Sequence, residues 1–168
     1  RLHDDPARYD AICKPMLEWA STKGWDKDYG GIYDELDPDG TVIADTKRIW
    51  PLAEALKANA LMLDSGVDKP AVKRRIHRML AVFYDHYMQE RGFWTEWLGR
   101  DLTPETDYMP GTTPYHVYFG IMETREVVLA RGKTRSLAAG SQLFLYALRR
   151  RLSEGVRAVR MGLKAQKS

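Results

Sequence analysis

The sequence predicts an all-α domain with short β-hairpins in its long loops. Apolar residues recur at spacings of three and four residues in five stretches, the pattern of an amphipathic helix. These stretches span residues 6–23, 46–65, 69–91, 114–130 and 134–152. Gly66, Gly92 and Gly132 follow the second, third and fourth stretches, at positions where a left-handed residue commonly ends a helix. At 168 residues the chain has the length of one domain, or of a large piece of one.

Each of the first three stretches has an apolar stripe. The first carries Ile12, Met16 and Trp19 on one side. The third also has a start signal, because Asp68 is a favoured N-cap residue and Pro70 falls in the first turn. The stripes of the second and third stretches hold five residues each, namely Trp50, Ala53, Leu56, Ala60 and Leu63, then Val72, Ile76, Met79, Phe83 and Tyr87.

Two connections, residues 24–45 and 92–113, are too long to be simple turns. In the first, apolar residues on both sides of the Pro38-Asp39-Gly40 turn predict a short hairpin. In the second, residues 93–97 predict another short strand. Because short links alternate with these long ones, we expect layered helices whose long loops emerge at one end, where functional residues are often found.

The positive charge of the chain is concentrated near its C-terminal end. Residues 147–168 hold seven basic residues against one acidic residue, whereas residues 1–146 hold 19 basic against 22 acidic residues. We interpret residues 153–168 as a solvated basic tail and expect no nucleic-acid partner. No apolar run reaches the roughly 18 residues that a membrane span needs, and Cys13 has no second cysteine to pair with. We therefore expect a cytoplasmic protein without a membrane partner, and the opening Arg1 suggests a piece of a longer chain.

The acidic hairpin has part of a calcium-binding pattern. Glu35, Asp37, Asp39 and Gly40 fall at positions one, three, five and six of an EF-hand loop, but Thr46 stands where that loop needs a glutamate. The Asp-Pro-Asp-Gly run also makes a good turn for purely local reasons, and we favour that interpretation.

Zinc ligands are not arranged at a suitable spacing either. His77 and His86 are nine residues apart on one predicted helix, and Cys13 is alone. We expect both histidines at the surface, and we expect neither a metal nor another cofactor.

His116 is a candidate proton-transfer group. It follows Pro114 and Tyr115 in the first turn of the fourth predicted helix, where the helix dipole favours a neutral imidazole that can accept a proton. Trp94 and Glu96, in the preceding long loop, are an aromatic residue and a carboxylate of the kinds that line sugar sites. The alternative is a histidine with a structural role at the end of a loop.

A second candidate cluster begins the second predicted helix. Trp50 and Glu54 lie four residues apart, so they share a helix face just after the first long loop. Arg48 precedes them. The alternative is an ordinary amphipathic helix with Trp50 in the core and Arg48 in solvent.

Three motifs together resemble the N-acylglucosamine 2-epimerase family, which includes cellobiose 2-epimerases, mannose isomerases and phosphomannose isomerases. They are Gly30-Gly31-Ile-Tyr-Asp-Glu, then Lys47-x-x-Trp-x-x-Ala-Glu, then Pro-Tyr-His116, in the order of the family, within residues 30–123. The resemblance implies part of an (α/α)6 barrel with the sugar in a central cavity at the loop-rich end. A complete barrel has six helix pairs, and five or six helices are expected here. We therefore expect residues 1–152 to be the C-terminal half of such a barrel.

The resemblance also implies a chemistry. Members of the family rearrange sugars by proton transfer next to a carbonyl, through an enediol or enediolate. His116 matches the late catalytic histidine, and the partner histidine of the family would precede Arg1. Trp50 and Glu54 match cavity positions, which implies stacking on a sugar and recognition of its hydroxyl groups.

The sequence departs from the cellobiose epimerases at one informative position. Those enzymes are similar but carry a tryptophan five residues before the histidine, and this chain has Gly111 there. The difference favours a monosaccharide or its phosphate, and Arg48 and Arg100 are candidates to meet a phosphate.

Two further functions stay open from the sequence. An (α/α)6 glycoside hydrolase would use Glu54 and Glu96, provided that their carboxyl groups lie roughly 5 to 9.5 Å apart. A helical interaction module would have no chemistry, and a half-barrel with exposed apolar faces would form a homodimer to cover them.

Overall fold

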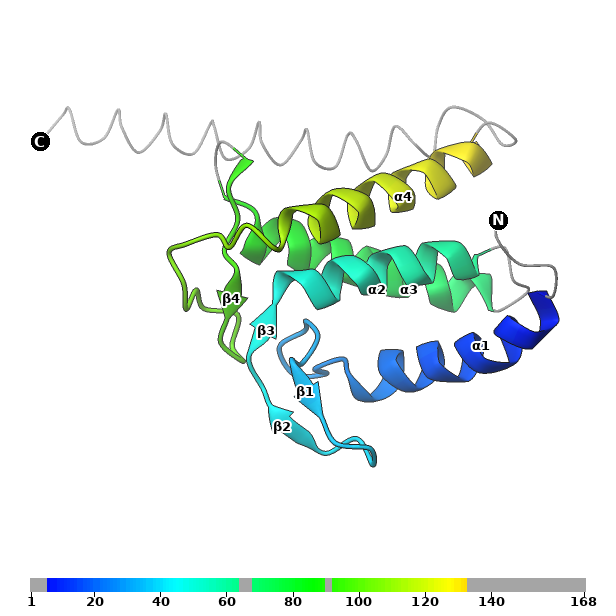
Figure 1. Ribbon diagram of the computed structural model, residues 1–168, viewed down its shortest axis with the longest axis horizontal. Helices are drawn as coiled ribbons and strands as arrows, with labels where there is room; N and C mark the ends of the chain where they lie inside the picture. The colour runs from blue at the N-terminus through cyan, green and yellow to red at the C-terminus, as the bar shows by residue number, and fades with distance from the viewer. Residues whose placement is uncertain (1–5, 64–67, 90–91, 133–168) are drawn as a thin grey trace, which may run out of the picture. The chain divides into compact units, whose positions relative to one another are not determined.

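The computed structural model describes residues 6–63, 68–89 and 92–132 (Figure 1). Its helices are α1 (Pro6–Lys23), α2 (Ile49–Met62), α3 (Lys69–Val82) and α4 (Pro114–Gly132). Four of the five predicted helices are thereby confirmed, and the fifth, at residues 134–152, lies outside the described residues, as does the predicted tail. One compact unit comprises Arg1–Arg125, and all the site residues discussed below belong to it.

The core lies between α2 and α3, where the predicted stripes meet. Asp68 caps α3 as expected, because its carboxylate accepts a hydrogen bond from the backbone N–H of Ala71 at 3.1 Å. The helix continues beyond Val82 as a π-helical turn, η1 (Phe83–Tyr87). The buried stripe residues of these two helices and the turn include Ala53, Leu56, Ala60, Leu63, Val72, Ile76, Met79, Phe83 and Tyr87.

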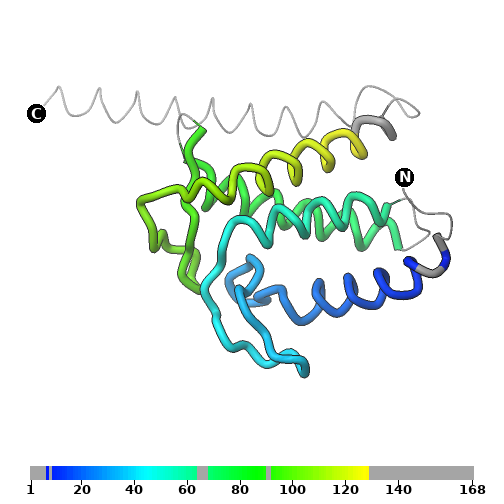
Figure 2. The backbone as a smooth tube through the Cα atoms, in the orientation of Figure 1, coloured from blue at the N-terminus to red at the C-terminus, as the bar shows by residue number. Residues whose placement is uncertain are grey.

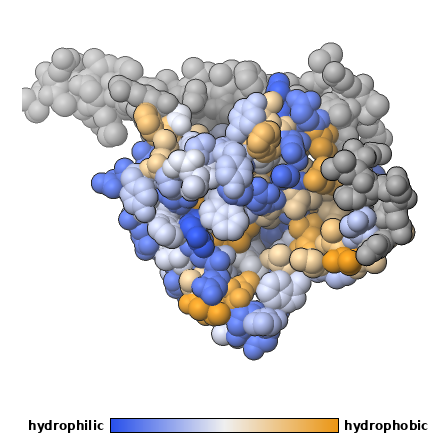
Figure 3. Space-filling model, viewed as in Figure 1, coloured by the Kyte–Doolittle hydropathy of each residue, from blue (hydrophilic) through white to orange (hydrophobic). Residues whose placement is uncertain are grey.

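The apolar stripe of α1 is not buried by the described residues. Ile12, Met16 and Trp19 are 56%, 65% and 40% exposed. The spacing that predicts the helix is therefore correct, but it does not reveal which surface the stripe packs against. On the face shown in Figure 3, hydrophobic residues lie among hydrophilic ones.

The long loops and all the strands lie at one end of the helices, as the alternation of link lengths predicts (Figures 1 and 2). In the first loop, β1 (Glu35–Leu36) pairs antiparallel with β2 (Val42–Ala44). Strand β3 (Lys47–Arg48) then pairs antiparallel with β4 (Trp97–Leu98), which comes from the second long loop. This second pairing joins the two loops directly in front of α2.

The Asp-Pro-Asp-Gly turn of the β1–β2 hairpin satisfies its own backbone. One carboxylate oxygen of Asp37 accepts hydrogen bonds from the N–H groups of Asp39, Gly40 and Thr41, at 3.1, 3.1 and 2.9 Å. Gly40 has a φ of 91°, which a residue without a side chain adopts readily. The acidic residues of this hairpin therefore have a local structural role.

Among the described helices, none combines the length and the hydropathy that a membrane crossing requires.

Candidate functional site

The Asp34 carboxylate joins the two long loops. Its Oδ1 accepts hydrogen bonds from the backbone N–H and the Nε of Arg48, at 2.9 and 3.0 Å. Its Oδ2 accepts from the Thr46 hydroxyl at 2.7 Å and from the Trp97 indole N–H at 2.8 Å. The side chain of Asp34 is only 4% exposed, so these four donors compensate for the loss of water around the charge.

Arg48 is held between two aromatic rings by this contact. The centre of its guanidinium group lies 5.5 Å from the centroid of the Trp50 ring and 5.5 Å from that of the Trp97 ring. Both distances are within the range of a cation–π attraction. The side chain stays 34% exposed, so the sequence-based alternative of a simply solvated arginine does not describe it.

His116 and Glu54, which are predicted on separate helices, form a direct pair. The Nδ1 atom of His116 lies 2.7 Å from Oε1 of Glu54. Partial burial raises the pKa of Glu54, but the hydrogen bond with His116 and the charge of Lys57, 3.5 Å away, outweigh that effect, and the resulting pKa is below its usual value. The two side chains are 22% and 36% exposed, so both are accessible to a small molecule.

Aromatic rings flank the imidazole of His116. The centroid of the Tyr115 ring lies 3.9 Å from that of His116, and the centroid of the Trp50 ring lies 5.4 Å away. Tyr115 is 54% exposed and Trp50 is partly buried. A histidine beside aromatic faces is an arrangement suited to a sugar, because the C–H face of a pyranose stacks on aromatic rings.

A glycine lets the helix that carries His116 approach the helix that carries Glu54. Gly120 lies one turn after His116 on α4, and a Cβ atom added to it would lie 2.5 Å from the carbonyl oxygen of Ala53. Ala53 immediately precedes Glu54 on α2. The close crossing of the two backbones therefore brings the pair within hydrogen-bond distance.

A buried ion pair joins β3 to the first long loop. Nζ of Lys47 lies 2.9 Å from Oδ2 of Asp26, and both side chains are fully buried. Burial alone would raise the pKa of Asp26, but hydrogen bonds from Lys47 and from the N–H groups of Asp28 and Tyr29 lower it to about 2. Lys47 also donates to the carbonyl of Arg100, and the Tyr87 hydroxyl donates to the carbonyl of Lys47 at 3.0 Å.

The side chain of Lys47 explains why the motif has a glycine at position 31. Gly31 has a φ of 86°, and a Cβ atom there would lie 2.8 Å from Cδ of Lys47. The stem of Lys47 thus occupies the space that a side chain at position 31 would need.

Glu96 is buried, and Trp94 is half-buried. Glu96 is 4% exposed, and its two carboxylate oxygens accept hydrogen bonds from the Thr113 hydroxyl at 2.8 Å and from the Trp94 indole N–H at 3.1 Å. Because both oxygens are engaged, no observation favours a hydrolase in which Glu96 acts on a substrate.

Other predicted residues lie apart from the pair. Arg100 binds Asp28 at 2.9 Å and also contacts Asp26, so its charge belongs to the buried ion pair. Cys13, His77 and His86 are exposed, as expected of the two histidines. In the described part of the chain, no three His, Cys, Asp or Glu side chains come together to hold a metal.

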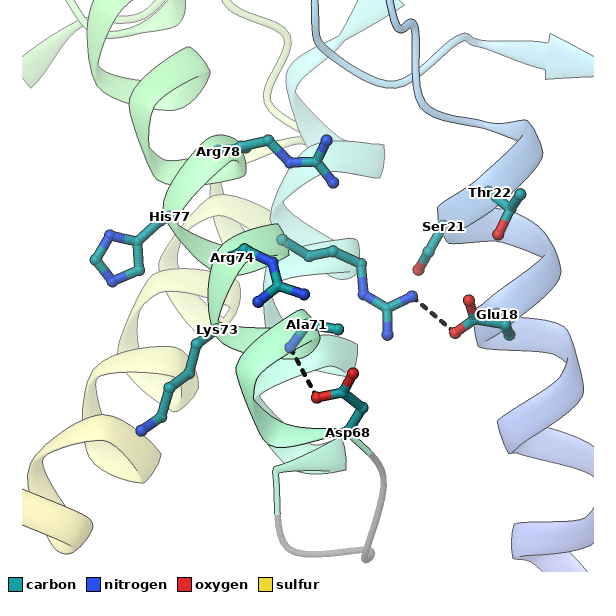
Figure 4. A pocket seen from close by; sticks show the side chains of 10 residues that line it. Glu18, Ser21, Thr22, Asp68, Ala71, Lys73, Arg74, His77 and Arg78 are labelled. Atoms are coloured by element: carbon teal, nitrogen blue, oxygen red, sulfur yellow. Dashed lines mark hydrogen bonds and ion pairs between the residues drawn. The ribbon is translucent and has the colours of Figure 1, made fainter.

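A separate pocket of about 970 Å³ lies between α1 and α3 (Figure 4). It is lined by basic side chains of α3 and by Glu18, Ser21 and Thr22 of α1. Arg75 spans it and binds Glu18 at 2.8 Å, while Arg78 lies over the Trp25 ring at 5.1 Å. None of the residues predicted for the sugar site lines this pocket.

The sequence alone indicates no role for Asp34, Lys47 or Gly120. Asp34 and Lys47 belong to the motifs, but the partners that define their roles are distant in the sequence. A glycine inside a helix is a usable signal, because it is unfavourable there unless another backbone comes close.

Known proteins are similar to this chain in sequence and in structure. The family model for N-acylglucosamine 2-epimerase (GlcNAc 2-epimerase) matches residues 6–120. A crystal structure of a D-mannose isomerase is similar, with a TM-score of 0.58 and 24% identity, over 65% of this chain and 28% of that one. The structure of cellobiose 2-epimerase from Spirochaeta thermophila DSM 6192 is also similar, with a TM-score of 0.62 and 19% identity, over 77% and 34%. A search of curated proteins finds no match.

These comparisons confirm the predicted fold. Both solved structures have the (α/α)6-barrel fold, and the described helices correspond to part of such a barrel. The chain spans about a third of the length of each or less. Because the family match covers more than half of the sequence, the chain belongs to the N-acylglucosamine 2-epimerase family of carbohydrate epimerases and isomerases.

Proposed function

We propose that this chain is the C-terminal part of a sugar 2-epimerase or aldose–ketose isomerase, with residues 1–152 in the barrel and His116 as its general acid/base. The observation that carries the proposal is the 2.7 Å contact between His116 and Glu54, beside the aromatic rings of Trp50 and Tyr115. His116 lies in the first turn of α4, and Glu54 lies five residues after the start of α2. The long loops lie at these helix ends (Figure 1), which is where a barrel of this kind would bind a sugar.

The geometry suggests how the proton moves. With the Nδ1–H of His116 donating to Glu54, the lone pair of Nε2 is available to take the proton from C2 of an open-chain aldose. The electrons of that C–H bond form the C1–C2 double bond, and the carbonyl oxygen becomes an enediolate oxygen. Return of the proton to C1, together with transfer of the O2 hydroxyl proton to O1, forms the C2 carbonyl of the ketose. Protonation of C2 on its opposite face by a second donor instead re-forms the C1 carbonyl and gives the epimer.

The two outcomes need different numbers of proton donors. Isomerisation can proceed with His116 alone, because one group serves one face of the sugar. Epimerisation needs a second donor on the other face, which the family resemblance places before Arg1. The solved relatives are about three times longer than the part matched here, so residues outside this chain would complete the cavity. We expect little or no activity from this chain alone.

A monosaccharide or its phosphate is the proposed substrate. Trp50 would stack on the sugar, Tyr115 would flank it, and the exposed guanidinium edge of Arg48 would bind a hydroxyl or phosphate oxygen. Gly111 leaves open space where a larger side chain would contact a second sugar ring. No cofactor is needed for this chemistry, and we propose a cytoplasmic location because the lone Cys13 gives no sign of an oxidising compartment.

Proton NMR in D2O tests the reaction class. Mannose, glucose, fructose, N-acetylglucosamine, N-acetylmannosamine and mannose 6-phosphate would each be incubated with the longer parent protein and with this chain. Loss of the C2-proton signal of an aldose, or of a C1-proton signal of fructose, together with new anomeric signals would support the proposal and identify the substrate. The absence of exchange with every sugar in the parent protein would refute it.

A further inference from the structure

We propose that Glu96 is a positioning residue, which sets the distance between His116 and Glu54 by joining the first turn of α4 to the first turn of α2. Its catalytic meaning rests on the proposed function, but the structural statement can be tested without any activity. Neither the family match nor the sequence motifs assign this role.

The carboxylate of Glu96 is engaged in internal contacts. It is 4% exposed, and a hydroxyl and an indole N–H each donate to one of its two oxygens. Because the side chain is buried, a substrate hydroxyl would have little access to the lone pairs that these two donors leave free. The contacts therefore favour a residue that holds protein groups in place over one that binds the sugar.

One of these donors stands at the start of α4. Thr113 immediately precedes Pro114, the first residue of the helix, and its carbonyl accepts the N–H groups of His116 and Val117 at 3.0 and 3.3 Å. A threonine at this position commonly uses its hydroxyl oxygen to cap its own helix. Here the buried hydroxyl donates to Glu96 instead, at 2.8 Å, and ties the helix start to the second long loop. The negative charge near the N-terminus of α4 also interacts favourably with the helix dipole.

The backbone of the same residue holds the start of α2. The carbonyl of Glu96 accepts the N–H of Ile49 at 3.1 Å, and Ile49 is the first residue of that helix. The pairing of β3 with β4 fixes this contact, because Arg48 lies opposite Trp97. Glu96 thus contacts α2 through its backbone and α4 through its side chain.

These two contacts act at the ends of the helices that carry the pair. Glu54 lies five residues after Ile49, and His116 lies three residues after Thr113. The crossing at Gly120 sets how closely the helices approach, and the Glu96 contacts set where along their axes they meet. Loss of the side-chain contact would leave the crossing intact but release the first turn of α4.

Thr113 offers a matched pair of variants. Thr113→Val removes the hydroxyl with almost no change in shape, whereas Thr113→Ser keeps it. In this chain, NMR would follow two signals of the folded protein, the Nδ1 proton of His116 in its hydrogen bond and the NOE between the His116 and Trp50 rings. We expect both signals to be lost in Thr113→Val and kept in Thr113→Ser. Unchanged signals in Thr113→Val, or their loss in both variants, would overturn the proposal.

Two substitutions of Glu96 itself provide a second test of the same NMR signals. A glutamine can accept the Trp94 N–H through its oxygen and donate its amide to the Thr113 hydroxyl, so Glu96→Gln should keep both signals, whereas Glu96→Ala should lose them. If Glu96→Ala does not fold, the Thr113 pair decides the matter. In a parent protein that exchanges the C2 proton, Thr113→Val should lower kcat roughly 10- to 100-fold with little change in KM. A parent without exchange would refute the proposed function, whereas the NMR signals would still test the role of Glu96.

Discussion

The close crossing of α4 and α2 predicts an unusual response to Gly120→Ala. Replacing a glycine inside a helix by alanine normally stabilises the helix by about 1 kcal/mol. Here the new Cβ atom would lie 2.5 Å from the carbonyl oxygen and 3.0 Å from the Cβ atom of Ala53. Both neighbours belong to a helix backbone or are fixed to it, so they cannot turn aside as a long side chain would.

The cost can be estimated from these distances. The Cβ–oxygen distance is about 0.9 Å shorter than the 3.4 Å at which ordinary contacts begin, so α4 must shift by an amount of that order. Overpacking of this kind typically costs about 1 to 3 kcal/mol. After the gain of about 1 kcal/mol in helix propensity, we expect a net loss of up to about 2 kcal/mol in the free energy of unfolding, where the propensity alone would give a gain. The same shift would lengthen the 2.7 Å contact between His116 and Glu54.

Urea denaturation, followed by circular dichroism, measures the change in stability. Gly111→Ala is the matched control, since no atom lies within 4 Å of a Cβ atom added there, and its effect should stay within about 0.5 kcal/mol. The Nδ1 proton of His116 reports on the pair in the same samples. If the Gly120→Ala protein is as stable as the unsubstituted chain and its His116 signal is unchanged, then the crossing of α4 and α2 does not limit the size of residue 120.

The buried ion pair gives two further predictions. Lys47→Met leaves the carboxylate of Asp26 buried without its main partner and should cost about 3 to 5 kcal/mol in urea denaturation, whereas Lys14→Met, at an exposed pair, should cost less than about 1 kcal/mol. Because the pKa of Asp26 is lowered to about 2 in the folded state, its contribution to stability is present above its unfolded value, near 4, and is lost as the pH falls from there towards 2. Thermal unfolding between pH 5 and pH 2 should therefore show a smaller loss of stability in the Asp26→Asn variant than in the unsubstituted chain. An equal loss in both proteins would contradict this.

Local signals made the helices and the first hairpin predictable. The expected helix at residues 6–23 coincides with α1, and Asp68 with Pro70 marks the start of α3 correctly. The Asp-Pro-Asp-Gly turn could be assigned because its hydrogen bonds join residues within four positions of each other. These features depend on neighbours in the sequence, which periodicity and turn chemistry capture.

The contacts that assemble the site join distant residues. Trp97 reaches Asp34 across 63 positions, and His116 reaches Glu54 across 62. The sequence motifs could name His116 and Glu54 as candidates, but only the structure brings them into one pair. It also separates Glu96 from the open site, because a carboxylate in a loop gives no sign in the sequence of whether it faces solvent or buried donors.

The role proposed for His116 is transfer of the proton at C2 of a sugar. Its most direct test is the rate of C2-proton exchange in D2O, measured by NMR with the parent protein and its His116→Gln variant on the same sugar. Glutamine can keep a hydrogen bond to Glu54 but cannot act as a base near neutral pH, so the variant should stay folded and lose roughly two to four orders of magnitude in rate. Exchange at the rate of the parent protein in a folded His116→Gln variant would exclude His116 as the proton-transfer group.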